Sequence, residues 1–402
     1  MRKNVNNTLW ILLAGSIVSE TGMWIGFVGT LQFLQQVLSS TFNQALFLIV
    51  PSLLGLAIGP IAGRVVDQHA KQLILKVSSA LRILAPALML LAIEQRSIVF
   101  AVISTLIGGL VTSFYYPALR ATFPLVASGQ ALAMANMWNF NLITLARIIG
   151  TTFGGLLIVN DNLEVSYQLA MLSYVVIALQ TWLIRIDEDA TSNRHNQVDS
   201  RKMAFTEVLR LIGNSRELVF ALTINLIPYI FIAGFNIFVI GISTLQQNVG
   251  IKGALYTVEG VGILISSLFY RRMIKKFDVK NIILATAFLI CAAELFLLGA
   301  GNKWLSILGF AIFGISGGFF IPTLQTFLQN SVENTYHGRL FSLKRMLETG
   351  ITLVTLPFYG IVIDRLGITS LMAIILTLST AIYLFAIAQL VGMNSRLAGE
   401  RR

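Results

Sequence analysis

Several charged side chains lie inside long apolar runs of this sequence, where a charge is costly to place. Arg82 and Glu294 are two of them, and three more are candidates for function: Glu20, Arg147 and Glu259. An ionised carboxylate at bilayer depth costs roughly 2.5–3.5 kcal/mol on insertion scales, so such a group faces a cavity, finds a partner or carries a proton. We predict that all three are proton-coupling residues. The alternative for Glu20 is a structural hydrogen bond to a neighbouring helix.

Arg147 lies within a polar stripe that has the spacing of a helix. At about 100° per residue, one face carries Asn136, Thr144, Arg147 and Thr151. The guanidinium there could pair with Glu20, bind an anionic group of a substrate, or simply hold two helices together. The sequence leaves these three roles open.

A constant offset relates the two halves of the chain. Pro117 and Pro322 are 205 positions apart (322 − 117), and each lies in a similar Gly-rich and aromatic stretch. The same offset relates Gly55 to Gly260, Gly109 to Gly314, Gly155 to Gly360 and Glu20 to Asn225. Two apolar halves in the same order are typical of a transporter built from parallel repeats, with its substrate site between them.

Composition predicts the elements that position these residues. Hydrophobic residues make up 56% of the 402 and charged residues 12%, against about 25% charged in a soluble domain; the mean hydropathy is +0.78. We predict an all-α integral membrane protein with about 12 transmembrane helices in two six-helix repeats, the first helix being retained and not cleaved. The spans are expected near 9–36, 44–63, 73–93, 97–118, 133–158, 166–184, 217–244, 253–270, 281–300, 304–328, 341–363 and 370–392.

The domains and their orientation follow from polar segments and basic residues. We predict a six-helix bundle over 1–184, a cytoplasmic linker over 185–216 and a second bundle over 217–402. Basic residues concentrate in alternate loops, and the opposite loops hold few, among them Lys252. By the positive-inside rule, both termini are expected in the cytoplasm. The net charge of +11 then orients the protein and contacts anionic lipids, and it does not indicate nucleic acid.

The sequence contains no residue pattern typical of an enzyme active site or of a metal site. Cys291 is the only cysteine, so an internal disulfide is excluded. The sequence has no His, Cys and carboxylate set with metal-ligand spacing, no nucleophile motif and no P-loop. We therefore expect no catalytic residue, no metal and no cofactor, and transport driven by an ion or substrate gradient.

The loop after the second predicted span carries a family resemblance. It reads Gly63-Arg-Val-Val-Asp67-Gln68-His-Ala70-Lys71. Gly63, Asp67 and Lys71 match a loop motif of the major facilitator superfamily, whereas Gln68 and Ala70 depart from it. With twelve spans, two repeats and a central linker, the chain resembles that superfamily over its whole length. The resemblance implies that Asp67 meets the unpaired N–H groups at the start of span eleven.

Span five contains a second motif of that superfamily. Gly150, Gly154 and Gly155 resemble the Gly-Pro-x-x-Gly-Gly element of its antiporters, with Thr151 in place of proline; small residues there permit tight helix packing. On span eleven, Arg345 and Glu348 are three positions apart and can satisfy each other. The expected gating residues are Gly63, Asp67, Lys71, Gly150, Gly154, Gly155, Arg345 and Glu348.

The resemblance also implies a central cavity between spans one, four, seven and ten. Its expected lining is Trp24, Phe27, Tyr115, Tyr116, Asn136, Asn225, Tyr229, Asn236, Phe319 and Phe320. An aromatic cavity with a few amides and one acid suits a large amphipathic molecule better than a sugar. Ordinary aromatic packing is the alternative for each of these rings.

Local stretches from Phe114 to Arg120 and from Gly338 to Ser342 are most similar to the branch of macrolide-type drug exporters and siderophore exporters. The expected function is export of an amphipathic organic molecule by proton antiport and alternating access. The expected partners are this substrate, protons and membrane lipids, with a monomer in the bacterial cytoplasmic membrane. The alternatives are a lysophospholipid flippase, a nutrient or organic-anion importer with Arg147 as ligand, and a membrane sensor that does not transport.

Overall fold

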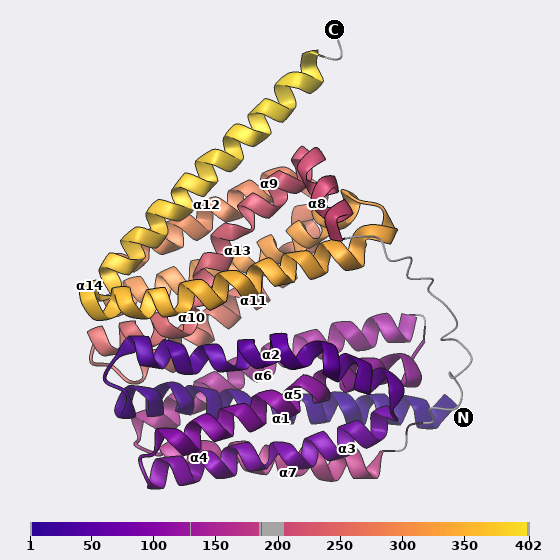
Figure 1. Ribbon diagram of the computed structural model, residues 1–402, viewed down its shortest axis with the longest axis vertical. Coiled ribbons are helices and arrows are strands. Elements are labelled where there is room, and N and C mark those ends of the chain that lie inside the picture. Colours follow the sequence, from indigo (N-terminus) through magenta and orange to yellow (C-terminus); the bar gives the residue numbers. More distant parts are fainter. Residues whose placement is uncertain (1, 129, 185, 187–204, 400–402) are drawn as a thin grey trace. The chain divides into compact units, whose positions relative to one another are not determined.

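The computed structural model describes residues 2–128, 130–184, 186 and 205–399, and this part is α-helical with short connections (Figure 1). The all-α prediction is confirmed. Most of the expected linker, residues 185 and 187–204, lies outside the described residues. Its remainder begins with helix α8 (Phe205–Asn214).

The chain divides into two compact units. Unit 1 comprises Met1–Val198 and Val249–Thr257, and unit 2 comprises Asp199–Asn248 and Val258–Arg402. The helices of unit 1 are α1 (Arg2–Val37), α2 (Thr41–Gln68), α3 (Lys71–Arg82), α4 (Leu84–Glu94), α5 (Ile98–Val126), α6 (Gln130–Val159) and α7 (Leu163–Leu183), joined by the first turns of α11 (Ile251–Lys276). Unit 2 contains α8, the rest of α11, and α9 (Arg216–Ile224), α10 (Leu226–Leu245), α12 (Val279–Leu297), α13 (Lys303–Asn330) and α14 (Asn334–Gly399).

Two predicted spans are each interrupted just before a proline. Helix α3 ends at Arg82 and α4 begins at Leu84, and Pro86 follows in the first turn of α4. Proline lacks the N–H that would bond the carbonyl four residues earlier, and its ring clashes with that carbonyl. Pro228 has the same relation to the break between α9 and α10. The sequence therefore interrupts the main-chain hydrogen bonding in the middle of each of these spans.

The described helices account for the predicted number of membrane spans. Eleven described helical stretches are long and apolar enough to cross a bilayer, and the last, Leu340–Val391, has 52 residues. It lies in α14, which is interrupted at Gly367 with φ 81° and ψ 165°. Figure 1 shows the orange and yellow parts of α14 running in different directions. Gly367 separates the two spans expected at 341–363 and 370–392, which confirms the prediction of about twelve.

We predict that Gly367→Ala destabilises the protein through backbone strain. Gly367 adopts a region of φ and ψ that essentially only glycine occupies, and strain of this kind costs on the order of 1–3 kcal/mol. A Cβ there would meet no atom within 4 Å, so a clash is not the cause. The measurement is the thermal unfolding midpoint of the detergent-purified protein. Gly350→Ala in the same helix, also in open space, is the control, and equal midpoints for both variants would contradict the prediction.

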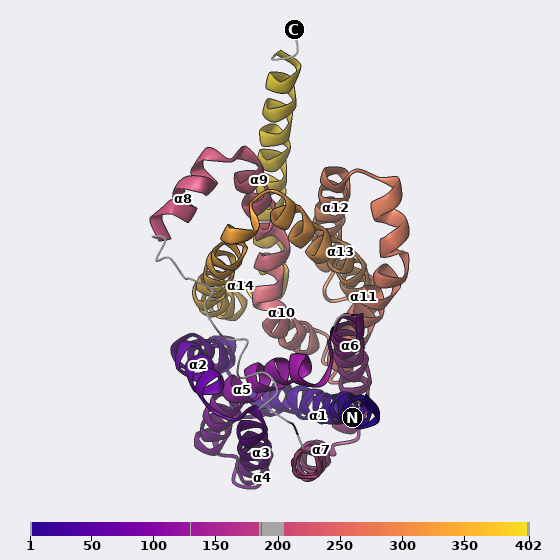
Figure 2. The same cartoon turned by 90° about the vertical axis from the view of Figure 1, so that its right-hand side faces the viewer.

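In unit 1, helix α1 is central to the packing. It packs along α6 and α7, while α5 packs against α2, α3 and α4; Figure 2 shows α1 between α6 and α7. Buried side chains such as Leu12, Tyr115, Phe123 and Tyr174 form one apolar cluster between these helices. Since lipid is as apolar as the side chains, close packing and polar contacts must hold such helices together.

In unit 2, helix α10 packs against α14, and α12 packs against α13 and α14. Aromatic rings fill the centre of this unit. Phe231 stacks on Phe313 with ring centroids 4.1 Å apart, and Phe310 and Phe238 contact Phe231 edge-on. These rings supply contact area that lipid cannot replace.

Candidate functional site

Glu20 lies in the interior of unit 1 and has a defined partner. Its side chain on α1 is buried, with 4% of the residue exposed. The hydroxyl of Tyr116 on α5 donates a hydrogen bond to Oε1 of Glu20 at 2.7 Å, and Sδ of Met23 lies 3.5 Å from the same hydroxyl. A carboxyl group in this position links α1 to α5 through one strong bond.

Arg82 lies next to this pair, at the end of α3 before the proline break. It is buried, with 1% exposed, and its guanidinium carbon lies 4.4 Å from the ring centroid of Tyr174, 4.6 Å from that of Tyr115 and 5.7 Å from that of Tyr116. Ring faces stabilise a cation in this arrangement. Tyr116 thus contacts both the guanidinium of Arg82 and the carboxyl group of Glu20. Sequence reasoning identified Arg82 only as one more intramembrane charge and suggested Arg147 as the partner of Glu20.

Arg147 instead lies over an aromatic group. Its guanidinium carbon is 5.8 Å from the ring of Trp24, and Trp24 contacts Phe27 and Tyr256 with centroids 5.5 and 6.0 Å apart. Tyr256 belongs to the segment of α11 that is part of unit 1. The expected cavity residues Trp24 and Phe27 therefore pack on each other and on Tyr256.

Lys252 was expected in an external loop just before a span, whereas the structure places it inside a helix. It lies in the first turn of α11, within the part that belongs to unit 1, and none of its surface is exposed. Its Nζ donates hydrogen bonds to Oε1 of Gln32, at 2.6 Å, and to Oε1 of Gln35. Two amide oxygens on α1 thus replace the water that a lysine ammonium normally keeps.

The glycines of α6 bring it into close contact with α1. A Cβ on Gly150 would lie 2.6 Å from the carbonyl oxygen of Thr21 and 2.7 Å from Cβ of Trp24. Gly154 meets Ile25 in the same way, and Gly155 approaches Gly253. Thr151, in place of the proline of the motif, donates its hydroxyl to the carbonyl of Arg147 at 2.8 Å. This geometry leaves no room for side chains at Gly150, whereas the gating role stays a prediction.

The loop motif around Gly63 shows no such packing. A Cβ on Gly63 would meet no atom within 4 Å, so close helix approach there is not seen. Asp67 is exposed, and Nζ of Lys71 donates to the main-chain oxygen of Asp67 at 3.3 Å. The role of these residues as a latch stays a prediction.

Unit 2 has its own polar group near the break before α10. Nδ2 of Asn225 donates to Oε1 of Glu348 at 3.2 Å, and Glu348 also forms an ion pair with Lys344, four residues earlier on α14. The expected partner of Glu348 was Arg345, which is exposed. Positions three and four residues apart share one helix face, so the spacing alone does not decide between them.

The remaining expected residues are distributed over both units. Glu259 is buried on α11 where Gly314 of α13 reaches its backbone, and Phe320 is buried on α13. Phe319 stacks near Tyr270 with centroids 6.5 Å apart. Tyr229 and Asn236 are half-buried, and Asn136 is exposed. Among the described residues, no group of three His, Cys, Asp or Glu side chains could hold a metal ion.

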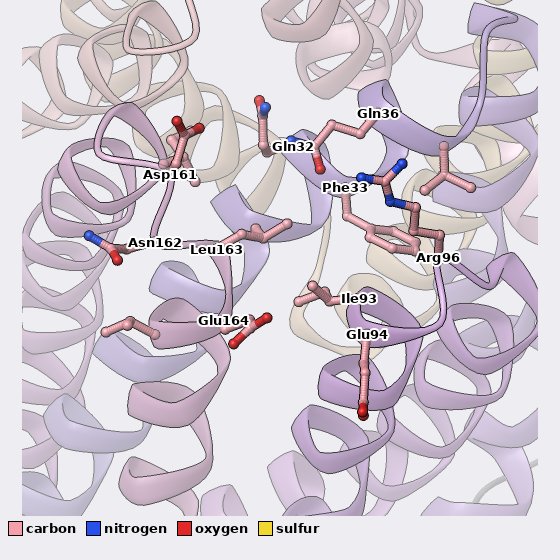
Figure 3. Close-up of a pocket in the computed structure, with 13 residues that line it drawn as sticks. Gln32, Phe33, Gln36, Ile93, Glu94, Arg96, Asp161, Asn162, Leu163 and Glu164 are labelled. Carbon is pink, nitrogen blue, oxygen red and sulfur yellow. The ribbon is translucent and has the colours of Figure 1, made fainter.

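Unit 1 contains two hollows relevant to ligands. The larger, of about 890 Å³, lies at the end of α1 and at the turns before α5 and α7. Figure 3 shows Asp161 and Arg96 on opposite sides of it, with Gln32 between them. Gln32 is twelve residues beyond Glu20, about 18 Å along a helix. The smaller hollow, of about 250 Å³, is lined by Arg82 together with residues of α1, α2, α4, α5 and α7.

Comparison with known proteins gives a consistent picture of the fold. Residues 9–349 match the sequence model of the Major Facilitator Superfamily. Two crystal structures of the nucleoside transporter NupG, one of them of a mutant, superpose with TM-scores of 0.73 and 0.75 at 12% identity, over 96% of this chain and 99–100% of theirs. A bacterial homologue of the human lysosomal transporter Spinster, in an inward-facing unoccupied conformation, gives 0.70 at 12% identity, over 97% of this chain and 98% of its own. No match was found among curated protein sequences.

Proposed function

The chain belongs to the major facilitator superfamily, and from this premise we propose that it exports a small amphipathic organic molecule in exchange for protons. Glu20 is the proton carrier in this proposal. The observation that supports it best is the bond from Tyr116 to a buried carboxyl group, with the guanidinium of Arg82 beside the ring of the same tyrosine. An intramembrane carboxyl group with polar partners is the usual form of a proton site in a transporter.

The proposed cycle uses the two states of Glu20. The ionised carboxylate accepts a hydrogen bond from the Tyr116 hydroxyl, which holds α1 against α5. In this proposal the cation of Arg82 on α3 also attracts the carboxylate. Protonation from the outer side removes that attraction, weakens the link between these helices and releases the substrate outward. Release of the proton to the inner side restores the link. The proton affinity of Glu20 differs between the outward-open and inward-open conformations, and this difference drives each change of state.

The other expected residues have secondary places in this proposal. Arg147 and Glu259 are further candidates for proton coupling, and the predicted aromatic and amide residues are candidates for substrate contact. The outward direction rests on the resemblance of Gly150, Gly154 and Gly155 to the antiporter element. The bundles over 1–184 and 217–402 are proposed to alternate their access as a monomer in the bacterial cytoplasmic membrane. Macrolide-like drugs and siderophores are the proposed substrates.

The test is efflux from cells that contain the protein. Cells are loaded with a panel of fluorescent amphipathic drugs, and efflux is followed with and without an uncoupler. We expect efflux above that of cells lacking the protein, and loss of this excess when the proton gradient collapses. Efflux that persists without the gradient would favour a lipid flippase. A panel without any transported dye would contradict broad drug export and direct the search to siderophores and lysolipids.

One observation favours a second function, uptake of an organic anion together with a proton: among the described residues, the guanidinium nitrogens of Arg82 have no hydrogen-bond partner. If an anion binds Arg82, it competes with the carboxylate of Glu20 for one positive charge. Protonation of Glu20 would then strengthen anion binding, which is the linkage of cotransport and not of exchange. Uptake of a labelled organic acid that rises when the outside is acidified would select this function.

A further inference from the structure

Arg82 is a buried cation with unused hydrogen-bonding capacity. Within the described part of the chain, Nε, Nη1 and Nη2 of Arg82 have no hydrogen-bond partner. The three tyrosine rings around it stabilise its charge through their faces, but they do not satisfy its five N–H donors. Burying such donors without acceptors is costly. The geometry therefore calls for an acceptor that the protein does not supply.

The hollow beside Arg82 is where such an acceptor would enter. Its volume is about 250 Å³, below the 300–1,000 Å³ of pockets that hold whole drug-sized ligands. Its wall is mainly apolar, with Met23, Phe27, Pro86, Met89 and Ala170 among the lining residues. The space therefore suits a small apolar body or one end of a larger molecule.

Several other polar groups of this lining are already engaged. The hydroxyl of Ser104 donates to the carbonyl of Ala85 at 2.6 Å, and the hydroxyls of Thr30 and Tyr167 bond each other at 2.9 Å. Arg82 is the only charged residue in the lining. The hollow thus combines the buried guanidinium of Arg82 with a wall that is otherwise uncharged and mainly apolar.

From this combination we propose that the hollow binds a carboxylate group on Arg82, with an apolar body against Met23, Phe27 and Met89. A guanidinium fork matches a carboxylate through two parallel N–H···O bonds. With Glu20 protonated, the single positive charge of Arg82 balances a monoanion, whereas a phosphate dianion would leave excess negative charge. The proposal concerns binding alone, so it depends neither on the direction of transport nor on Glu20 being the coupling site.

The test measures binding directly, by isothermal titration calorimetry with the purified protein and without any gradient. The probes are 3-phenylpropanoate and its neutral analogue 3-phenylpropanamide. Because charge-assisted hydrogen bonds are lost with the amide, we expect roughly 10- to 100-fold tighter binding of the acid. Equal affinity for the two probes would overturn the proposal. A failure of drug efflux would leave this result unaffected, so the two proposals fail separately.

Variants assign the binding to Arg82. Arg82→Met should remove the preference for the acid, and Arg82→Lys, which keeps the charge but loses the fork, should weaken binding of the acid by about tenfold. Thr105→Leu, at the wall of the hollow, should weaken both probes together by filling space. The matched control is Arg120→Met on α5, since Arg120 is exposed and is not among the residues that line the hollow. Loss of binding in that control, or its retention in Arg82→Met, would overturn the assignment.

Two sources of carboxylate are distinguished by a third probe. Octanoate binding more tightly than 3-phenylpropanoate would assign the hollow to fatty acids, and the reverse order would assign it to aryl acids. Either order of affinity is consistent with a carboxylate bound to Arg82. Should Arg82→Met fail to fold, the conservative Arg82→Lys and the cavity-filling Thr105→Leu still decide the proposal, with size-exclusion profiles as the check on folding.

Discussion

Replacing Glu20 by glutamine is expected to abolish proton-driven transport while leaving the protein folded. The amide of glutamine has nearly the shape of the carboxyl group, and its oxygen can still accept the hydroxyl of Tyr116. It cannot take up a proton, so the state change that the gradient drives is lost. We expect the uncoupler-sensitive rate to fall on the order of tenfold or more. The measurement is substrate flux in proteoliposomes with an imposed pH gradient.

A matched control separates this effect from a general loss of acidic charge. Glu94 ends α4 in the same unit and is exposed, so Glu94→Gln removes one carboxylate without touching the Glu20 pair. Its proton-driven flux should equal that of the wild type. Exchange of substrate without a gradient should survive in Glu20→Gln, because the amide does not block the path. Proton-driven flux at the wild-type rate in Glu20→Gln would exclude Glu20 as the coupling site.

Much of the fold could be predicted from the sequence, because a bilayer leaves a chain few choices. Backbone groups in hydrocarbon must bond within the segment, so apolar runs of sufficient length become helices. The helix interruptions before Pro86 and Pro228 follow from the missing N–H of proline. Gly367 lies between the two spans predicted at 341–363 and 370–392. The sharp break there depends on its φ of 81°. Glycine permits this angle but does not require it, so the sequence alone does not predict the break.

The partners of the buried charges could not be predicted in the same way. Helical periodicity places residues on one face of their own helix, but it does not say which neighbouring helix that face meets. Glu20 accepts a hydrogen bond from Tyr116, 96 positions away. The sequence alone offered equal grounds for Arg147 as the partner of Glu20. Lys252 lies 220 positions from its amide partner Gln32. A signal for Arg82 did exist, since it is an arginine in an apolar run just before a proline bend.

The second large effect is expected at Gly150, where α6 meets α1. Gly150→Leu should reduce the yield of folded protein sharply, because even its Cβ would lie 2.6 Å from the carbonyl oxygen of Thr21. Backbone atoms cannot move aside as a flexible side chain can. Gly150→Ala adds the Cβ alone, and overpacking of this kind costs about 1–3 kcal/mol. Thermal unfolding midpoints and size-exclusion profiles of detergent-purified protein measure both variants.

The comparison with Gly55 tests whether packing or helix propensity is responsible. A Cβ on Gly55 of α2 would meet no atom within 4 Å, so Gly55→Leu and Gly55→Ala should be neutral, or more stable by up to ~1 kcal/mol. Equal losses at Gly55 and Gly150 would contradict the packing argument.

Thr21 follows Glu20 directly, so any shift of α1 that accommodates Gly150→Ala also moves the carboxyl group relative to Tyr116. Folded Gly150→Ala protein should therefore transport more slowly than the wild type, because the contact that permits α1 to pack also positions its acid.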